Sequence, residues 1–145
     1  MLKGIAKVIP PELLKVLDEM GHSDRIVLGD ANFPAMTCGK ESMVIRCDGI
    51  KMPELLEGIL ELFPLDTFVE HPVLLMEHSA NQEVPPIWKT YEKIISKVDP
   101  RGGSVMNPIE RFRFYEEAKT SYAVVATGEM MLNANIILQK GVITD

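Results

Sequence analysis

Residues 11–30 read PELLKVLDEMGHSDRIVLGD, a helical pattern that leads directly into a strand pattern. Pro11 suits the first turn of a helix, and apolar residues recur on one helical face from Leu13 to Met20. Gly21 then favours the end of that helix. The apolar run after Arg25 predicts a short buried strand, which ends in a Gly-Asp turn at Asp30. This stretch therefore predicts one helix–strand unit of an α/β domain.

The same alternation continues along the chain. Strands are predicted at residues 42–49, 73–76, 122–129 and 135–144, and the segment 31–41 is predicted to be a loop. Helices are predicted at residues 52–64, 85–97 and 107–119, the last with a stripe of Ile109, Phe112, Tyr115 and Ala118. Apolar strands that alternate with helices favour a mostly parallel sheet covered on both faces. We expect a three-layer α/β/α fold, with residues 1–145 forming a single domain.

The composition excludes several classes of protein. The chain is 46% hydrophobic and 25% charged, as is typical of a globular protein, and its formal net charge is −6. An acidic chain without a dense Lys/Arg run is a poor match to a phosphate backbone, so we expect no nucleic-acid partner. No apolar run approaches the roughly 20 residues that span a bilayer, and the N-terminal segment lacks a signal peptide pattern. We expect no membrane partner and a cytoplasmic location.

No cofactor or metal motif is present. The sequence contains none of the glycine-rich or nucleophile-elbow motifs that bind dinucleotides and phosphates or mark hydrolases. Cys38 and Cys47 lack CxxC spacing and are expected to be free thiols. His71 and His78 each follow a glutamate, but a predicted strand separates them, so solvated histidines are the simpler interpretation than a metal site. We expect neither a metal nor an organic cofactor.

Two sets of polar residues can carry acid/base chemistry. His22 has a side chain type that titrates near pH 6.5 and can transfer a proton, and Asp30 can bind a sugar hydroxyl. His22 also suits a structural role at a helix end, and Asp30 suits one in a turn. From these two residues alone, the structural interpretation is simpler than the catalytic one. Arg111 and Tyr115 lie four apart on one predicted helical face, where a cation and a phenol can reach one ligand, such as a carbohydrate.

Four segments resemble the L-fucose mutarotase family, the sister group of the D-ribose pyranases. They are PELLKVLDEMGHSDRIVLGDANFPA (11–35), DGIKMPELLEGILELFPLDTF (48–68), RFRFYEEAK (111–119) and ATGE with NIILQKGV (126–129 and 135–142). The segments occur in order and cover nearly the whole chain. The resemblance implies a three-layer α/β enzyme that interconverts the α and β anomers of a free monosaccharide, most simply L-fucose, without metal or cofactor. It also implies a ring-shaped homo-oligomer, typically a decamer.

The resemblance assigns roles residue by residue. It places the proton donor at His22, and because ring opening needs an acid and a base together, we assign Tyr115 as the second catalytic group. It implies substrate contacts at Asp30, Asp66, Met76, Arg111, Asn133 and Asn135. One motif departs from the family pattern, because Asn133 stands where the family usually carries tyrosine, and an amide cannot donate a proton as a phenol can.

Three questions follow from these assignments. His22 and Asp30 flank a predicted strand and would lie up to about 27 Å apart if the chain were extended, so either the chain folds back or a neighbouring subunit completes the pocket. A pyranase acting on D-ribose would use the same ring opening. A non-catalytic sugar-binding or regulatory module is the alternative from another class, and it would bind anomers without accelerating their exchange.

Overall fold

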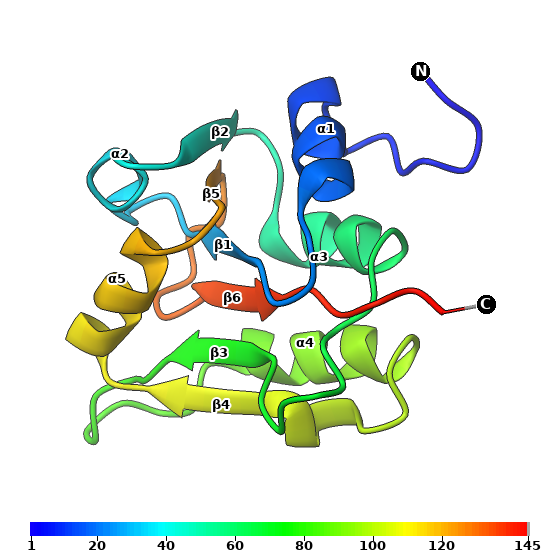
Figure 1. Cartoon of the computed structure of the whole chain (residues 1–145). Helices are drawn as coiled ribbons and strands as arrows, with labels where there is room; N and C mark the ends of the chain where they lie inside the picture. The colour runs from blue at the N-terminus through cyan, green and yellow to red at the C-terminus, as the bar shows by residue number, and fades with distance from the viewer. Residues whose placement is uncertain (145) are drawn as a thin grey trace.

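The computed structural model describes residues 1–144, and a six-stranded sheet forms its centre (Figure 1). The strands are β1 (Arg25–Gly29), β2 (Met43–Cys47), β3 (Val73–Met76), β4 (Met106–Ile109), β5 (Ala123–Thr127) and β6 (Ile136–Gln139). Across the sheet they lie in the order β2-β5-β1-β6-β3-β4. Strands β1, β2 and β5 are mutually parallel, as are β3 and β4, whereas β6 runs antiparallel to both of its neighbours.

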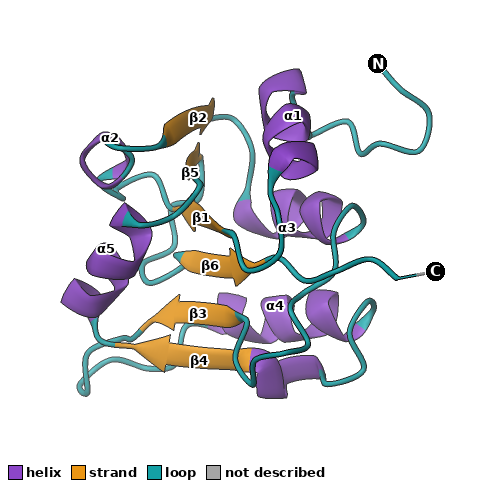
Figure 2. Cartoon of the chain, in the orientation of Figure 1, coloured by secondary structure: helices purple, strands orange, loops and turns teal. Residues whose placement is uncertain are grey.

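Helices cover both faces of this sheet (Figure 2). They are α1 (Pro11–Glu19), α2 (Ala35–Cys38), α3 (Met52–Leu60), α4 (Pro86–Ser96), the 3₁₀ helix η1 (Gly102–Val105) and α5 (Arg111–Lys119). Helices α1, α3 and α4 pack on one face, where Ile26 and Leu28 of β1 point. Helices α2 and α5 pack on the other, where Val27 points, because successive strand side chains alternate. The predicted three-layer α/β fold is confirmed.

The direction of β6 shapes the site. A parallel crossover needs a dozen or more residues, and the loop 128–135 between β5 and β6 is shorter than that. The chain therefore enters β6 from the edge at which β5 ended. As a result, the amino end of β6 meets the carboxyl ends of β1 and β3 at one edge of the sheet.

Local structure differs from the sequence prediction around β4 and α5. Residues 107–109, predicted to be helical, belong to β4, an edge strand that accommodates Pro108 because it pairs only with β3. Helix α5 begins later, and its predicted apolar stripe is wrong: Phe112 is 61% exposed, whereas Phe114 is fully buried. The segment RFRF offers two phenylalanines, and the way in which α5 follows β4 points Phe114 and not Phe112 into the core.

Other predicted boundaries also change. The loop 31–41 contains the short helix α2, the helix predicted at 52–64 ends at Leu60, and the strand predicted at 135–144 ends at Gln139. Cys38 and Cys47 are buried free thiols, and burial raises the pKa of both. Within residues 1–144, no helix has the length and hydropathy to cross a membrane, and no cluster of three or more His, Cys, Asp or Glu residues can hold a metal ion.

Candidate active site

A cavity of about 820 Å³ lies at the sheet edge where three carboxyl strand ends meet the amino end of β6. Asp30 follows β1, Met76 ends β3, Arg111 follows β4 by two residues, and Asn135 directly precedes β6. Ligands in open α/β sheets gather at such edges, because backbone and side-chain polar groups converge there. The sheet topology therefore builds this site from segments far apart in the sequence.

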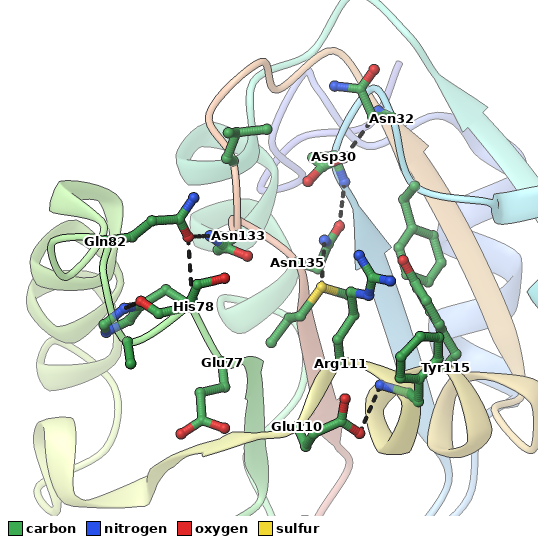
Figure 3. Close-up of a pocket in the computed structure, with 16 residues that line it drawn as sticks. Asp30, Asn32, Glu77, His78, Gln82, Glu110, Arg111, Tyr115, Asn133 and Asn135 are labelled. Atoms are coloured by element: carbon green, nitrogen blue, oxygen red, sulfur yellow. Dashed lines mark hydrogen bonds between the residues drawn. The ribbon is translucent and has the colours of Figure 1, made fainter.

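The floor of the cavity is a hydrogen-bonded set of four residues (Figure 3). The Asp30 N–H donates to Asn135 Oδ1 at 2.7 Å, and Asn135 Nδ2 lies 3.7 Å from the Met76 sulfur. One Asp30 carboxylate oxygen, Oδ1, accepts from the Asn32 N–H at 2.9 Å. Because these bonds fix the Asp30 backbone and orient its carboxylate, the floor is preorganised to receive hydroxyl groups.

Asp30 is buried, with 6% of its surface exposed, although it lines the cavity. Burial raises the pKa of its carboxyl group, and the nearby Glu129 carboxylate adds to this effect, while hydrogen bonds from Asn32 and Asn135 oppose it. Asp30 therefore holds a proton more readily than an ordinary aspartate does. It can accept a hydrogen bond from a hydroxyl group or exchange a proton with one.

Helix α5 supplies one wall. The Glu110 carboxylate caps this helix by accepting from the Phe112 and Arg113 N–H groups, which sets the direction of its first turn. The Arg111 guanidinium lies 4.7 Å from the Phe112 ring centroid and points into the cavity beside Tyr115 (Figure 3). The Tyr115 ring packs at a tilt against Phe33, with ring centroids 5.8 Å apart. A cationic donor and a phenol thus face the same space.

The opposite wall comes from the loop after β3 and from the loop before β6. Asn133 adopts a left-handed backbone (φ 57°), which asparagine tolerates better than most residues. Its backbone carbonyl accepts from Trp88 Nε1 at 3.1 Å, and its Nδ2 lies 3.4 Å from Gln82 Oε1. Sequence reasoning missed Gln82 and its loop neighbour Glu77, which also line the cavity. Glu77 directly follows the carboxyl end of β3, and this position is a signal that could have found it, whereas Gln82 lies further along the loop and carries no such signal.

His22 and Asp66 lie elsewhere. His22 precedes β1 and Asp66 pairs by its N–H with the carbonyl of Gln139 at the end of β6, so both occupy the sheet edge opposite the cavity. The structure therefore brings together six of the residues assigned from sequence, and it leaves His22 and Asp66 as a separate pair. The six are Asp30, Met76, Arg111, Tyr115, Asn133 and Asn135.

The separate pair has its own polar surroundings. His22 Nε2 lies 3.2 Å from both carboxylate oxygens of Asp66, and the His22 ring packs against Phe68 with centroids 5.1 Å apart. Asp66 also accepts from the Phe68 N–H at 2.9 Å and from Gln139 Nε2 at 2.8 Å. Burial raises the pKa of Asp66, but these hydrogen bonds together outweigh it and hold the pKa below its ordinary value. A charged, buried carboxylate thus anchors a half-exposed imidazole.

Comparison with known proteins gives consistent matches over nearly the whole chain. The model of the RbsD / FucU transport protein family matches residues 3–143. The fucose mutarotase of Mus musculus is 50% identical, over 97% of this chain and 94% of that protein. The structure of FucU from Bifidobacterium longum superposes with a TM-score of 0.95 at 52% identity, covering 98% of this chain and 100% of that one. The fucose mutarotase of Streptococcus pneumoniae, solved in complex with L-fucose, superposes with a TM-score of 0.93 at 47% identity, covering 99% and 100%.

Proposed function

Because the chain belongs to the RbsD / FucU family, we propose that it is a mutarotase that interconverts the α and β anomers of free L-fucose. The single observation that carries this proposal is the cavity at the sheet edge, in which Asp30, Arg111, Tyr115 and Asn135 face one space. Similarity to a fucose mutarotase solved with L-fucose supports the choice of sugar.

The reaction needs an acid and a base that act on neighbouring oxygens. A base takes the proton of the anomeric hydroxyl while an acid gives one to the ring oxygen, so the bond between the anomeric carbon and the ring oxygen breaks and an aldehyde forms. After rotation about the next carbon–carbon bond, the reverse transfers close the ring on the other face. Each positioned proton-transfer group contributes about 10²- to 10⁴-fold. We assign these transfers to His22 and Tyr115.

The remaining residues of the cavity bind and orient the sugar. Asp30 and Asn135 offer oxygen acceptors at a rigid floor, and Arg111 offers a fork of donors from the wall. Met76 supplies an apolar surface for the carbon skeleton. Asn133 contacts the sugar at the rim, where its amide can hydrogen-bond but cannot transfer a proton as a phenol can. This arrangement holds the ring while the proton-transfer pair acts on the anomeric centre.

His22 reaches the sugar from a neighbouring copy of the chain. Within one chain the His22–Asp66 pair and the cavity lie at opposite sheet edges, so two chains must meet for all the assigned residues to share a site. Apolar side chains stand exposed next to both places: Phe68 against His22 is 73% exposed, and Phe112 and Leu132 at the cavity are 61% and 62% exposed. An interface between two different surfaces closes into a ring when its rotation allows it. We propose a homo-oligomeric ring, a decamer as the family resemblance implies, with sites shared between neighbours.

The activity belongs in the cytoplasm. Two buried cysteines remain unpaired, and reducing compartments keep thiols in this form. The substrate is then a free monosaccharide in the same compartment.

The deciding experiment is NMR saturation transfer between the anomeric signals of L-fucose, D-ribose and a panel of other free monosaccharides. We expect the protein to accelerate α/β exchange of L-fucose most strongly. Faster exchange between pyranose and furanose forms of D-ribose than between fucose anomers would favour the pyranase alternative. Binding of fucose without any acceleration would identify a sugar-binding or regulatory module.

A further inference from the structure

A chain of polar side chains connects the His22–Asp66 pair to helix α5 and takes no part in the cavity. Gln139, the last residue of β6, is 6% exposed and donates from Nε2 to Asp66 Oδ2 at 2.8 Å. Its Oε1 accepts from Arg25 Nε at 2.9 Å, and Arg25 forms an ion pair with Glu117 of α5. The chain of polar side chains therefore runs from Glu117 through Arg25, Gln139 and Asp66 to His22.

The chemistry of the two partners determines which way the Gln139 amide faces. Arg25 Nε can only donate, and the Asp66 carboxylate can only accept, so one orientation of the amide satisfies both. The strand pairing places Arg25 directly opposite Gln139 in the β1–β6 ladder, which holds the two side chains in reach of each other. Without Arg25, the amide could rotate and turn its oxygen toward the carboxylate.

Asp66 in turn fixes the tautomer of His22. An ionised carboxylate accepts, so His22 Nε2 must carry the hydrogen at 3.2 Å from its oxygens. In the neutral imidazole the Nδ1 atom then keeps its lone pair, on a side chain that is 41% exposed. An imidazole held in this way can present Nδ1 to a ligand outside its own chain.

Other charged groups near the pair are engaged elsewhere. Arg101 donates to the backbone carbonyl of Asp66 at 3.0 Å and not to its carboxylate. Lys140 Nζ donates to two backbone carbonyls at the end of α1, and the Asp24 carboxylate accepts from the Gly21 N–H. Within residues 1–144, His22 and Gln139 are thus the side chains that donate to the Asp66 carboxylate.

We propose that Gln139 is a positioning residue for the mutarotase reaction: oriented by Arg25, it fixes the Asp66 carboxylate and so selects the His22 tautomer that has Nδ1 open to the sugar. This inference rests on the proposed function, in which His22 transfers a proton. It adds three residues to the catalytic arrangement, namely Gln139, Arg25 and Glu117, none of which touches the sugar.

The test compares Gln139→Leu with the parent in two independent measurements. We expect anomer exchange to slow about tenfold, the size of one lost hydrogen bond to a charged group. Ring ¹⁵N NMR of His22 at pH 8 should change from a single Nε2–H tautomer to a mixture, because an Asp66 carboxylate that Gln139 no longer holds can turn away from His22 Nε2. The matched control is Arg46→Gln, which breaks an exposed arginine–aspartate pair on β2 and should change neither measurement. A parent-like tautomer and rate in Gln139→Leu would overturn the proposal.

Arg25→Gln tests the same chain from a position at which no core side chain is lost. It should slow exchange less than Gln139→Leu does, and the double variant should be no slower than Gln139→Leu alone, because Arg25 acts through Gln139. Additive losses in the double variant would overturn this order of action. If the parent itself fails to accelerate exchange, the proposed function fails, whereas the tautomer measurement still decides whether Gln139 controls His22.

Discussion

His22 Nε2 lies 3.2 Å from both carboxylate oxygens of Asp66, and the two side chains differ sharply in exposure. Asp66 is 1% exposed, whereas the His22 side chain is 41% exposed. The pair therefore has a buried anchor and an open end. This asymmetry separates the effects that we expect from substitutions at the two positions.

Asp66→Asn should lower the stability of the protein and its activity together. An amide places an N–H₂ group among donors from Phe68, Gln139 and His22, so at least one buried donor loses its partner, at a cost of about 1–3 kcal/mol. We expect the free energy of unfolding in urea to fall by this amount at pH 7, with slower anomer exchange. The exposed Asp48→Asn variant is the control and should change little.

The same variant carries a pH signature. Because the folded-state pKa of Asp66 is lowered, its stabilising contribution is fully present above the unfolded pKa of about 3.9 and is lost as pH falls through the lower folded value. The stability difference between the parent and Asp66→Asn should therefore shrink as pH falls from about 5 to about 2. A difference that stays constant over this range would contradict the assignment.

His22→Gln should instead leave stability nearly unchanged and slow anomer exchange by at least about 100-fold, the lower end for one acid/base group. Glutamine can still hydrogen-bond to Asp66 but cannot transfer a proton near neutral pH. The control is His71→Gln, because His71 contacts the Ser104 carbonyl by its Nδ1 and the exposed Glu70 carboxylate by its Nε2, and lies outside the cavity lining. Thermal unfolding and NMR exchange on the same samples make the comparison. A rate within a few-fold of the parent would make His22 a structural residue.

Asp30→Asn should stabilise the fold while it impairs catalysis. Burial raises the pKa of Asp30, so its charged form is disfavoured in the folded state, and folding loses stability as pH rises through the folded pKa. Replacing the carboxyl with an amide removes this cost near neutral pH and keeps an oxygen for the Asn32 N–H. We expect the thermal midpoint of Asp30→Asn to exceed that of the parent by more at pH 8 than at pH 4. Anomer exchange should be slower in the variant. If the variant had a lower thermal midpoint than the parent at pH 8, the Asp30 charge would be stabilised by its hydrogen bonds in the folded protein.

Much of the fold could be predicted from sequence, because helix and strand periodicities are local. The segment 11–30 predicts α1 and β1, and Pro86 marks the start of α4. The edge strand β4 could not be recognised in the same way, since Pro108 and its few residues carry no strand pattern. The choice of Phe114 over Phe112 for the core also depends on how α5 meets the sheet, which is not a local property.

The candidate site could likewise be predicted only in part. Asp30 and Met76 follow or end strands, so the sheet topology brings them together with Asn135 once β6 is known to be antiparallel. His22 stands at the other end of the same strand as Asp30, and sequence alone left open whether the chain folds back. The extended strand β1 rules out that fold-back between the two residues. Residues of the loop after β3, such as Gln82, lacked any motif and became visible only through the cavity.

Asn133→Tyr should preserve or raise turnover on L-fucose at a small cost in stability. The substitution introduces the phenol that the family resemblance implies at this position, but the left-handed backbone of Asn133 strains a tyrosine by about 1–2 kcal/mol. Asn133→Gly is the matched control, because glycine adopts this conformation freely and lacks the phenol. We expect thermal unfolding to rank tyrosine below glycine, and exchange kinetics to rank them in the reverse order. A sharp loss of turnover in a folded, assembled Asn133→Tyr protein would indicate a cavity adapted to a different sugar.

Mixing two inactive variants should restore activity if neighbouring chains share each site. In His22→Gln the cavity keeps Tyr115, and in Tyr115→Phe the opposite edge keeps His22, so a site formed between one chain of each kind regains both groups. The two variants are mixed in equal amounts, dissociated and reassembled. In a head-to-tail interface, about one quarter of the randomly formed sites then combine an intact cavity with an intact His22, so about one quarter of the parent's exchange rate should return. Light scattering on each variant alone provides the control, since both must form the parent's homo-oligomer. A mixture as inactive as its components, or a parent that is monomeric at micromolar concentration, would contradict the shared site. Because His22 and Tyr115 lie at opposite sheet edges of one chain, either result would also exclude His22 as the partner of Tyr115 in catalysis.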